Sequence, residues 1–346
     1  MNIEGLQNVK YIQYEAKDFK SDQYVRWCPG CGDHAVLNAL QKAMAQYGCA
    51  PHNTAVISGI GCSSRLPYYM NTYGFHTIHG RGAAIASGVK IANPNLCVWL
   101  ATGDGDSLAI GGNHFIHAVR RNIDINILLL NNKIYGLTKG QYSPTSDRGF
   151  VSKSSPQGTV EDPFHPVELA FGARATFFAR GVDVDMVNTS VAMVAAAKHK
   201  GTSVVEILQN CIIFNDKIHS TVSSKDDRLK NTIMLKHGEK MLFGENNSQG
   251  IILDGFNLKA VKIGEGAYSI DDVLTHNAHE QDSTLHLKLG MMTPENGLPI
   301  ALGVIRDVEA PVYEQEFEKQ VEQEKKKHPK LTLTSFLRSK NGWEVK

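Results

Sequence analysis

Two short polar segments of this chain combine residues that can bind a phosphate and a metal ion. The first is Thr102-Gly103-Asp104-Gly105-Asp106-Ser107, and the second starts at Asn131-Asn132. Glycines let backbone N–H groups approach a diphosphate at the start of a helix, while a carboxylate and an amide oxygen can hold Mg²⁺ between the phosphates. The first segment alone would fit a simple Asp-Gly turn equally well. Together, the two segments predict a magnesium and diphosphate site.

A second group of residues is suited to a metal centre made of cysteines. Trp27-Cys28-Pro29-Gly30-Cys31-Gly32 places two thiolates three positions apart, a spacing that suits Zn²⁺, an iron–sulfur cluster or a redox dithiol. Cys62 and Cys211 each follow a predicted strand and can supply two more thiolates at one sheet edge. We therefore predict a four-cysteine centre beside the diphosphate. Cys49 and Cys97 are instead expected to be small buried residues.

Alternating helices and strands must position these groups. Apolar runs predict strands, and helical spacing predicts helices between them. The expected strands are Thr54–Ser58, Leu96–Thr102, Asp124–Asn131, Thr176–Phe178 and Ser203–Leu208, and the expected helices are Asp33–Tyr47, a helix that starts at Gly82 and is stopped by Pro94, Leu108–Arg121, His165–Gly172 and Met186–His199. This order predicts an α/β fold with an open, mostly parallel sheet and helices on both faces. In such a sheet both polar segments follow the carboxyl ends of strands, where ligands bind.

The chain divides into three parts by texture. Residues 1–24 are expected to form an N-terminal arm, residues 25–215 the domain that carries both motifs, and residues 216–346 a C-terminal extension with a charged helix at Tyr313–Lys330. Every candidate site residue lies in the second part, residues 25–215, and none lies in the extension.

Composition excludes several classes of protein. The 346 residues include 36 Lys and Arg against 35 Asp and Glu, so a polyanionic partner such as nucleic acid is not expected. No apolar window is long enough for a membrane span or a signal peptide, and a cytoplasmic location is therefore expected.

The pair formed by Gly103-Asp104-Gly105 and Asn131-Asn132 resembles the signature of thiamine diphosphate enzymes. That resemblance implies Mg²⁺ ligands at Asp104, Asn132 and the carbonyl of Ile134. The chain as a whole resembles the β subunit of 2-oxoacid:ferredoxin oxidoreductases, most of all those acting on 2-oxoglutarate. The resemblance rests on WCPGCGD, SGIGCSSRLPYY, HGRGAAIASGVK, TGDGDSLAIGGNHFIHAVRRN, LLLNNKIYGLTKGQYSPTS and the QNC run, in family order.

The resemblance implies an oxidative decarboxylation that forms an acyl-coenzyme A and CO2, with electrons passing through a [4Fe–4S] cluster to ferredoxin. The implied cluster ligands are Cys28, Cys31, Cys62 and Cys211. The residues expected to contact thiamine diphosphate are Gly61, Ser63, Gly103, Gly105, Asp106, Tyr135, Gly136 and Leu137. The glutamate that activates thiamine comes from the α subunit in this family, so a shared active site is implied.

Two further residues are candidates for work on the substrate. Arg65 follows Cys62 by three positions and can clamp a second carboxylate of the substrate, although a surface or structural arginine is an equal alternative. His79 precedes a glycine-rich helix start and is expected to be functional rather than a buried core histidine. Alternative functions are the same reaction on pyruvate or branched 2-oxo acids, a thiamine decarboxylase or acetolactate-type lyase, and a non-enzymatic protein with a four-cysteine zinc site.

Overall fold

An eight-stranded sheet forms the centre of the molecule. The structure is a computed structural model that describes residues 13–264, 268–327, 332–338 and 343. The strand order is β2-β1-β3-β4-β6-β5-β11-β7, and every neighbouring pair is parallel except β5 with β11. The bounds are β1 Thr54–Ser58, β2 Tyr73–His76, β3 Cys97–Gly103, β4 Asn126–Asn131, β5 Phe177–Val182, β6 Ser203–Leu208, β7 Thr232–Leu235 and β11 Ile300–Asp307. The predicted mostly parallel α/β sheet is confirmed.

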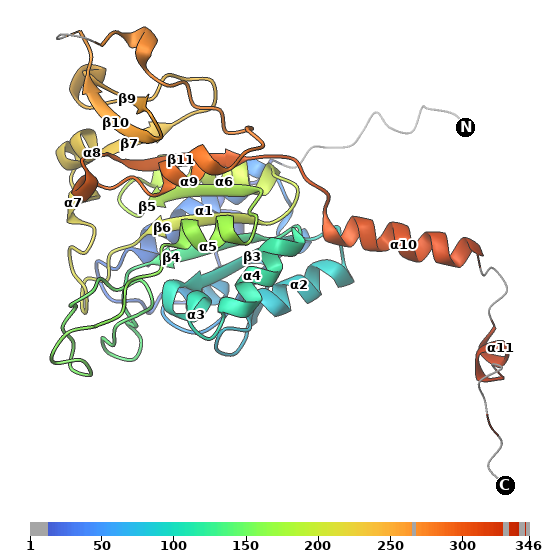
Figure 1. Cartoon of the computed structure of the whole chain (residues 1–346). Helices are drawn as coiled ribbons and strands as arrows, with labels where there is room; N and C mark the ends of the chain where they lie inside the picture. The colour runs from blue at the N-terminus through green and yellow to red at the C-terminus, as the bar shows by residue number, and fades with distance from the viewer. Residues whose placement is uncertain (1–12, 265–267, 328–331, 339–342, 344–346) are drawn as a thin grey trace.

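Helices cover both faces of this sheet (Figure 1). Helices α1 (Asp33–Tyr47) and α6 (Met186–Lys198) share one core with one side of the strands. The other core contains residues of α2 (Gly82–Ala92), α4 (Gly112–Arg121), α5 (Pro166–Gly172) and α9 (Thr284–Gly290). Successive strand residues alternate between the two cores, as in β4, because side chains point to opposite faces of a strand. Strands buried on both faces explain the continuous apolar runs in the sequence.

One predicted helix is wrong in part. The stretch Leu108–Arg121 forms no single helix: α3 (Asp104–Leu108) ends before α4 begins at Gly112. The break lies beside Gly111, where an added Cβ would lie 2.4 Å from the carbonyl oxygen of Asp106. The close approach and the low helix propensity of two adjacent glycines explain the interruption. As a result, Asp104 and Asp106 share the single turn of α3.

The chain after residue 215 adds to the same sheet and builds a second one. Strands β7 and β11 extend the main sheet, while β8 (Leu242–Phe243), β9 (Gln249–Asp254) and β10 (Asn257–Lys262) form a small antiparallel sheet. The remaining elements are α7 (Ser220–Ser223), α8 (Lys225–Asn231), α10 (Tyr313–Lys327), α11 (Leu333–Leu337), and the short 3-10 helices Ala16–Phe19, Pro51–Asn53, Ser63–Tyr69, Glu245–Asn247, Ile270–Asp272 and Pro294–Asn296.

Helix α10 extends away from the body of the molecule (Figure 1). It confirms the predicted charged helix as far as Lys327, and residues 328–330 lie outside the described residues. The first twelve residues of the expected N-terminal arm also lie outside them. Within the described part of the chain, none of the helices has the length and apolar character needed to cross a bilayer.

The prediction for Cys49 and Cys97 is also wrong in part, because both side chains are only partly buried. Cys49 follows the residue that ends α1, and Cys97 is the first residue of β3, so both lie where elements leave the core. Their thiols interact: a hydrogen bond with Cys97 lowers the pKa of Cys49 to about 6.

A buried ion pair connects β5 to β6 inside the sheet. Arg180 Nε lies 2.7 Å from Glu206 Oε2, and both side chains are almost fully buried. Asn131 Nδ2 donates to the other carboxylate oxygen of Glu206 at 2.9 Å. Burial alone would raise the pKa of Glu206, but the Arg180 charge and these hydrogen bonds outweigh it and keep the pKa below its ordinary value.

Removing one partner of this pair should be costly. We expect Arg180→Ala to lower the free energy of unfolding by about 3–5 kcal/mol at neutral pH, since the Glu206 charge would stay buried without a partner. The loss should shrink as acid protonates Glu206, because a carboxylate with a lowered pKa stabilises the fold only above its ordinary pKa range. Denaturant unfolding at several pH values measures this. Lys259→Ala, which breaks an exposed pair with Asp254, is the control and should stay close to wild type. Equal losses in the two variants would contradict the expected role of burial.

Candidate active site

The two polar segments meet at one edge of the sheet. Strands β3 and β4 are parallel neighbours with Gly103 opposite Leu130, and β6 follows with Leu208 opposite Asn131. Asp104, Asn132 and Gln209 are therefore the first residues beyond three adjacent strands. This edge is where open α/β sheets bind their ligands.

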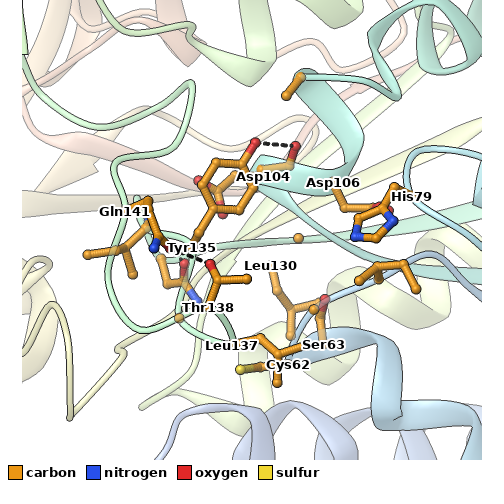
Figure 2. Close-up of a pocket in the computed structure, with 18 of the residues that line it drawn as sticks. Cys62, Ser63, His79, Asp104, Asp106, Leu130, Tyr135, Leu137, Thr138 and Gln141 are labelled. Carbon is orange, nitrogen blue, oxygen red and sulfur yellow. Dashed lines mark hydrogen bonds between the residues drawn. The ribbon is translucent and has the colours of Figure 1, made fainter. Parts of the chain in front are cut away.

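A cavity of about 520 Å³ opens at this edge (Figure 2). Its walls contain all eight residues predicted to contact the diphosphate cofactor, together with the three predicted magnesium ligands, His79 and Cys62. The lining residues used below are Gly61, Cys62, Ser63, His79, Gly103, Asp104, Gly105, Asp106, Ile110, Asn132, Ile134, Tyr135, Gly136 and Leu137. The residues of the predicted diphosphate and magnesium site thus line one cavity.

Asp104 is fixed by two hydroxyl groups of the loop that follows the second motif. Ser143 Oγ and Thr145 Oγ1 donate to Asp104 Oδ2 at 2.5 and 2.6 Å, and Asp104 is only 1% exposed. Burial raises the pKa of Asp104, although the two hydroxyl bonds act in the opposite direction. A buried carboxylate is costly without a positive partner, so this position is suited to a cation.

Asp106 uses its carboxylate to shape the cavity wall. Its Oδ1 accepts from the backbone N–H of Gly80 at 2.7 Å, and its Oδ2 accepts from Thr102 Oγ1 at 3.0 Å. The first bond fixes the loop that carries His79, which is an exposed residue rather than a core histidine. Figure 2 shows His79 and Tyr135 on different sides of the cavity.

Tyr135 closes the side of the cavity next to α3. Its hydroxyl donates to the carbonyl oxygen of Gly105 at 3.1 Å, and a Cβ added at Gly105 would lie 2.2 Å from the Tyr135 ring. The contact therefore requires glycine at position 105. Burial, together with the charges of Asp104 and Asp106, raises the pKa of Tyr135 to about 12. The Tyr135 hydroxyl therefore stays protonated and can keep donating its hydrogen bond to Gly105.

The charge of the cavity lining is negative. Asp104 and Asp106 face it, and among the described residues that line it there is no lysine or arginine. A diphosphate would add more negative charge to this wall. The donor set of one buried carboxylate, the Asn132 amide and the Ile134 backbone therefore fits Mg²⁺, which prefers oxygen ligands shared with phosphates.

Cysteines from three segments of the chain lie at the side of the cavity that Cys62 lines. A Cβ added at Gly136 would lie 3.4 Å from Cys211 Sγ and 3.6 Å from Cys62 Sγ, so both thiols lie close to this residue of the cavity lining. The indole of Trp27 donates to the carbonyl oxygen of Cys62 at 2.7 Å and brings in the loop before Cys28.

The charges of other cysteines act on the Cys62 and Cys31 thiols. Burial, followed by the Asp33, Cys211 and Cys28 charges, raises the pKa of Cys62 to about 12. Burial also raises the pKa of Cys31, where Cys62 and Cys211 contribute in the same direction. Thiols that resist ionisation when unbound fit a centre whose metal supplies the positive charge. Among the described residues, no three His, Cys, Asp or Glu side chains are close enough to share one metal ion.

Arg65 lies outside the set of residues that line the cavity. Its charge acts on Cys62, where it lowers the pKa of the thiol against the larger effects of burial and nearby negative groups. The side chain is partly buried beside the cysteines. A substrate contact for Arg65 therefore stays a prediction.

Sequence reasoning missed several polar residues around the site. Ser143 and Thr145 belong to a polar loop in which hydroxyl residues give no signal for a buried role. Asp33, next to the cysteine motif, is 1% exposed, and neither of its carboxylate oxygens has a hydrogen-bond partner. Burial raises the pKa of Asp33 to about 7. Gln209 is completely buried between the two motifs. Of these residues, only Asp33 gave a signal in the sequence, as a charged residue directly after the cysteine motif.

Comparison with known proteins first defines the class of this site. Residues 59–207 match the family profile of the C-terminal, thiamine pyrophosphate-binding domain of thiamine pyrophosphate enzymes. The matched range starts directly after β1, ends inside β6 and includes all the described residues that line the cavity. The fold and the site together define a thiamine diphosphate-binding protein.

Full-length relatives then show the particular family. Over 333 residues, 96% of this chain and 88% of the relative, the sequence is 46% identical to the 2-oxoglutarate oxidoreductase subunit KorB of Mycobacterium tuberculosis. The chain belongs to the family of 2-oxoacid:ferredoxin oxidoreductase β subunits. Subunit β of the 2-oxoacid:ferredoxin oxidoreductase 1 of Aeropyrum pernix is 47% identical over 57% of this chain and 62% of its own length.

A solved structure shares the fold. The 2-oxoglutarate:ferredoxin oxidoreductase of Magnetococcus marinus, with 2-oxoglutarate, coenzyme A and succinyl-CoA bound, matches with a TM-score of 0.71 and 30% identity. The match covers 91% of this chain and 95% of that chain. The resemblance inferred from the sequence motifs is thus confirmed at the level of family and fold.

Proposed function

We propose that this chain is the β subunit of a 2-oxoglutarate:ferredoxin oxidoreductase, which converts 2-oxoglutarate and coenzyme A to succinyl-CoA and CO2 and passes electrons to ferredoxin. The observation that carries the proposal is the wall shared by the cavity and the cysteines. Cys62 and Gly136 line the cavity, and the Cys62 and Cys211 thiols both lie beside the space that a Gly136 side chain would occupy. A cofactor in the cavity would lie directly beside a cluster held by these thiols.

Each proposed group has its own set of residues. Asp104, Asn132 and the Ile134 carbonyl would hold Mg²⁺, and Cys28, Cys31, Cys62 and Cys211 would hold a [4Fe–4S] cluster. Thiamine diphosphate supplies the electron sink for decarboxylation, and an iron–sulfur cluster accepts electrons singly. The chain itself orients the carboxylate of Asp104 through Ser143 and Thr145.

The α subunit is the proposed partner that completes this site. Among the described residues, no glutamate lines the cavity, and Glu206 is fully engaged with Arg180 and Asn131. The cavity lining includes apolar side chains that are more than half exposed, at Ile110 and Leu137. Exposed apolar groups around a functional hollow favour a protein partner.

The proposed choice of 2-oxoglutarate is supported by what the relatives are named for. The subunits from Mycobacterium tuberculosis and Methanothermobacter marburgensis, and the matched Magnetococcus marinus structure, all carry 2-oxoglutarate in their names. Pyruvate or a branched 2-oxo acid is the competing substrate.

Loss of the Asp104 charge should abolish cofactor binding. In the purified complex we expect Asp104→Asn to weaken Mg²⁺-dependent binding of thiamine diphosphate by about a hundredfold, because the ion loses its charged ligand. Calorimetric titration of magnesium and thiamine diphosphate measures this. Asp162→Asn, at an exposed ion pair with Arg148, should bind both normally. Undiminished binding by Asp104→Asn would refute the proposed magnesium site.

Iron content should separate the two groups of cysteines. We expect Cys28→Ser, Cys31→Ser, Cys62→Ser and Cys211→Ser to lose the cluster, since each thiolate binds one iron. Cys49→Ala and Cys97→Ala serve as controls that keep it. Iron, sulfide and zinc quantitation with visible spectra of anaerobically purified complex decides the matter. Stoichiometric zinc in the wild type would favour the structural zinc alternative.

Turnover of the α–β complex tests the substrate directly. We expect the wild type to prefer 2-oxoglutarate over pyruvate. If Arg65 clamps the second carboxylate, Arg65→Ala should lower kcat/KM for 2-oxoglutarate by about a hundredfold and affect pyruvate little. Equal losses on both substrates would assign Arg65 to the Cys62 thiol instead, and a wild-type preference for pyruvate would contradict the proposed substrate.

A further inference from the structure

Gln209 lies between the two proposed metal centres. It is the first residue after β6 and is completely buried. Its Oε1 accepts from Asn132 Nδ2 at 2.8 Å, and its Nε2 lies 2.6 Å from the carbonyl oxygen of Asn210 and 3.5 Å from Cys31 Sγ. One side chain therefore contacts a proposed magnesium ligand and a proposed cluster ligand, and every polar group it has is used.

The hydrogen bonds leave only one orientation for each amide. A carbonyl oxygen can only accept, so the Asn210 carbonyl requires the NH2 end of Gln209 on its side. Gln209 Oε1 then faces Asn132 and requires the NH2 end of that residue. Asn132, which lines the cavity, is left with its Oδ1 as acceptor, and this oxygen accepts from the backbone N–H of Ile134 at 3.2 Å. Gln209 therefore sets the orientation of the Asn132 amide, whose oxygen is the atom that Mg²⁺ would need.

The same NH2 group supplies a donor to the cysteine site. Its first hydrogen goes to the Asn210 carbonyl, and the second is available for Cys31 Sγ, at a distance suited to an N–H···S bond. Hydrogen bonds to cluster sulfurs stabilise the more negative, reduced state and raise the reduction potential.

Neighbouring contacts prevent Gln209 from moving between the sites. A Cβ added at Gly32 would lie 3.0 Å from Gln209 Cγ, and the backbone N–H of Gly32 donates to the Asn210 carbonyl at 3.2 Å. On the other side, Asn215 Nδ2 donates to the carbonyl oxygen of Asn132 at 3.0 Å. The segment 209–215, which includes Cys211, is therefore fastened to both motifs.

We propose that Gln209 is a positioning residue that couples the two centres, by orienting Asn132 toward Mg²⁺ and donating a hydrogen bond to the cluster thiolate of Cys31. This inference rests on the proposed function. It adds a link between groups that the motifs present as independent. Gln209 itself touches neither thiamine diphosphate nor substrate in this assignment.

Two substitutions at Gln209 separate its contacts. In Gln209→Met, of similar length, both bonds are lost. We expect Mg²⁺ affinity to fall about tenfold to a hundredfold, as is typical when a residue that orients a metal ligand is removed. We also expect the reduction equilibrium of the cluster to shift about tenfold toward the oxidised state, equal to ~59 mV for a one-electron couple. In Gln209→Glu the acceptor for Asn132 remains, so the potential should fall while Mg²⁺ affinity stays near wild type.

The measurements are made on the anaerobic α–β complex, by calorimetric titration of magnesium and by redox titration of the cluster signal. Gln41→Met is the matched control, because Gln41 is also a buried glutamine and bonds only to the Tyr69 carbonyl. It should leave both values unchanged. Folding of each variant is checked by iron content and circular dichroism, and Gln209→Glu remains informative if Gln209→Met does not fold.

The outcomes are distinct. A shift in both quantities for Gln209→Met, with a shift in potential alone for Gln209→Glu, supports the coupling. Unchanged values in iron-containing variants, or changes matched by Gln41→Met, overturn the inference and leave the proposed function intact. A wild-type complex without iron contradicts the proposed cluster, and the inference about Cys31 falls with it.

Discussion

The parallel register of β3, β4 and β6 is the constraint on which the site depends. Gly103 lies opposite Leu130, and Asn131 lies opposite Leu208, so the three strands end at the same level. Parallel neighbours need crossover helices, which cover both faces and leave only the carboxyl edge open for polar residues. A shift of one residue in any pair would turn alternate side chains to the other face and separate Asp104 from Asn132.

A series of buried polar contacts connects the sheet to the cavity. Glu206 is paired with Arg180 and accepts from Asn131, whose Oδ1 lies 3.0 Å from Thr145 Oγ1. Thr145 in turn donates to Asp104. Each member of such a network must be satisfied, since an unpaired buried polar group is costly. The first asparagine of the pair is therefore structural, while the second faces the cavity, although the sequence presents them as equivalent.

The motifs and the strands that carry them could be predicted from sequence because both are local signals. The apolar run 54–58 predicted β1 with its observed bounds, and the glycines at 103 and 105, which predicted a diphosphate site, line the cavity. Contacts between distant segments could not be predicted in the same way. The break between α3 and α4 depends on packing near Gly80, and the meeting of Cys49 with Cys97 depends on where two elements end.

Gln209 is a second residue whose contacts could not be predicted from the sequence. In the sequence it is a polar residue two positions before a cysteine, and nothing in its surroundings distinguishes it from a surface glutamine. Its role depends on the register of three strands and on a loop nearly two hundred positions earlier in the chain, at Cys31. The substrate contact predicted for Arg65 is a similar inference from proximity in sequence. In the structure Arg65 lies outside the residues that line the cavity, and its charge lowers the pKa of Cys62.

The distribution of charge explains why this sheet edge is suited to metal-containing cofactors. Asp33, Asp104 and Asp183 are largely buried there, and burial raises the pKa of each of them. Burying carboxylates together stores electrostatic free energy that a bound cation releases, because an opposite charge favours the ionised form. Binding of a cation to the folded chain alone then stabilises the fold in proportion to the logarithm of its concentration over its dissociation constant. Asp104, whose burial is unfavourable without a ligand, is the carboxylate that would give a magnesium ion its affinity, so the cost in folding and the selectivity for a cation have the same physical origin at this position.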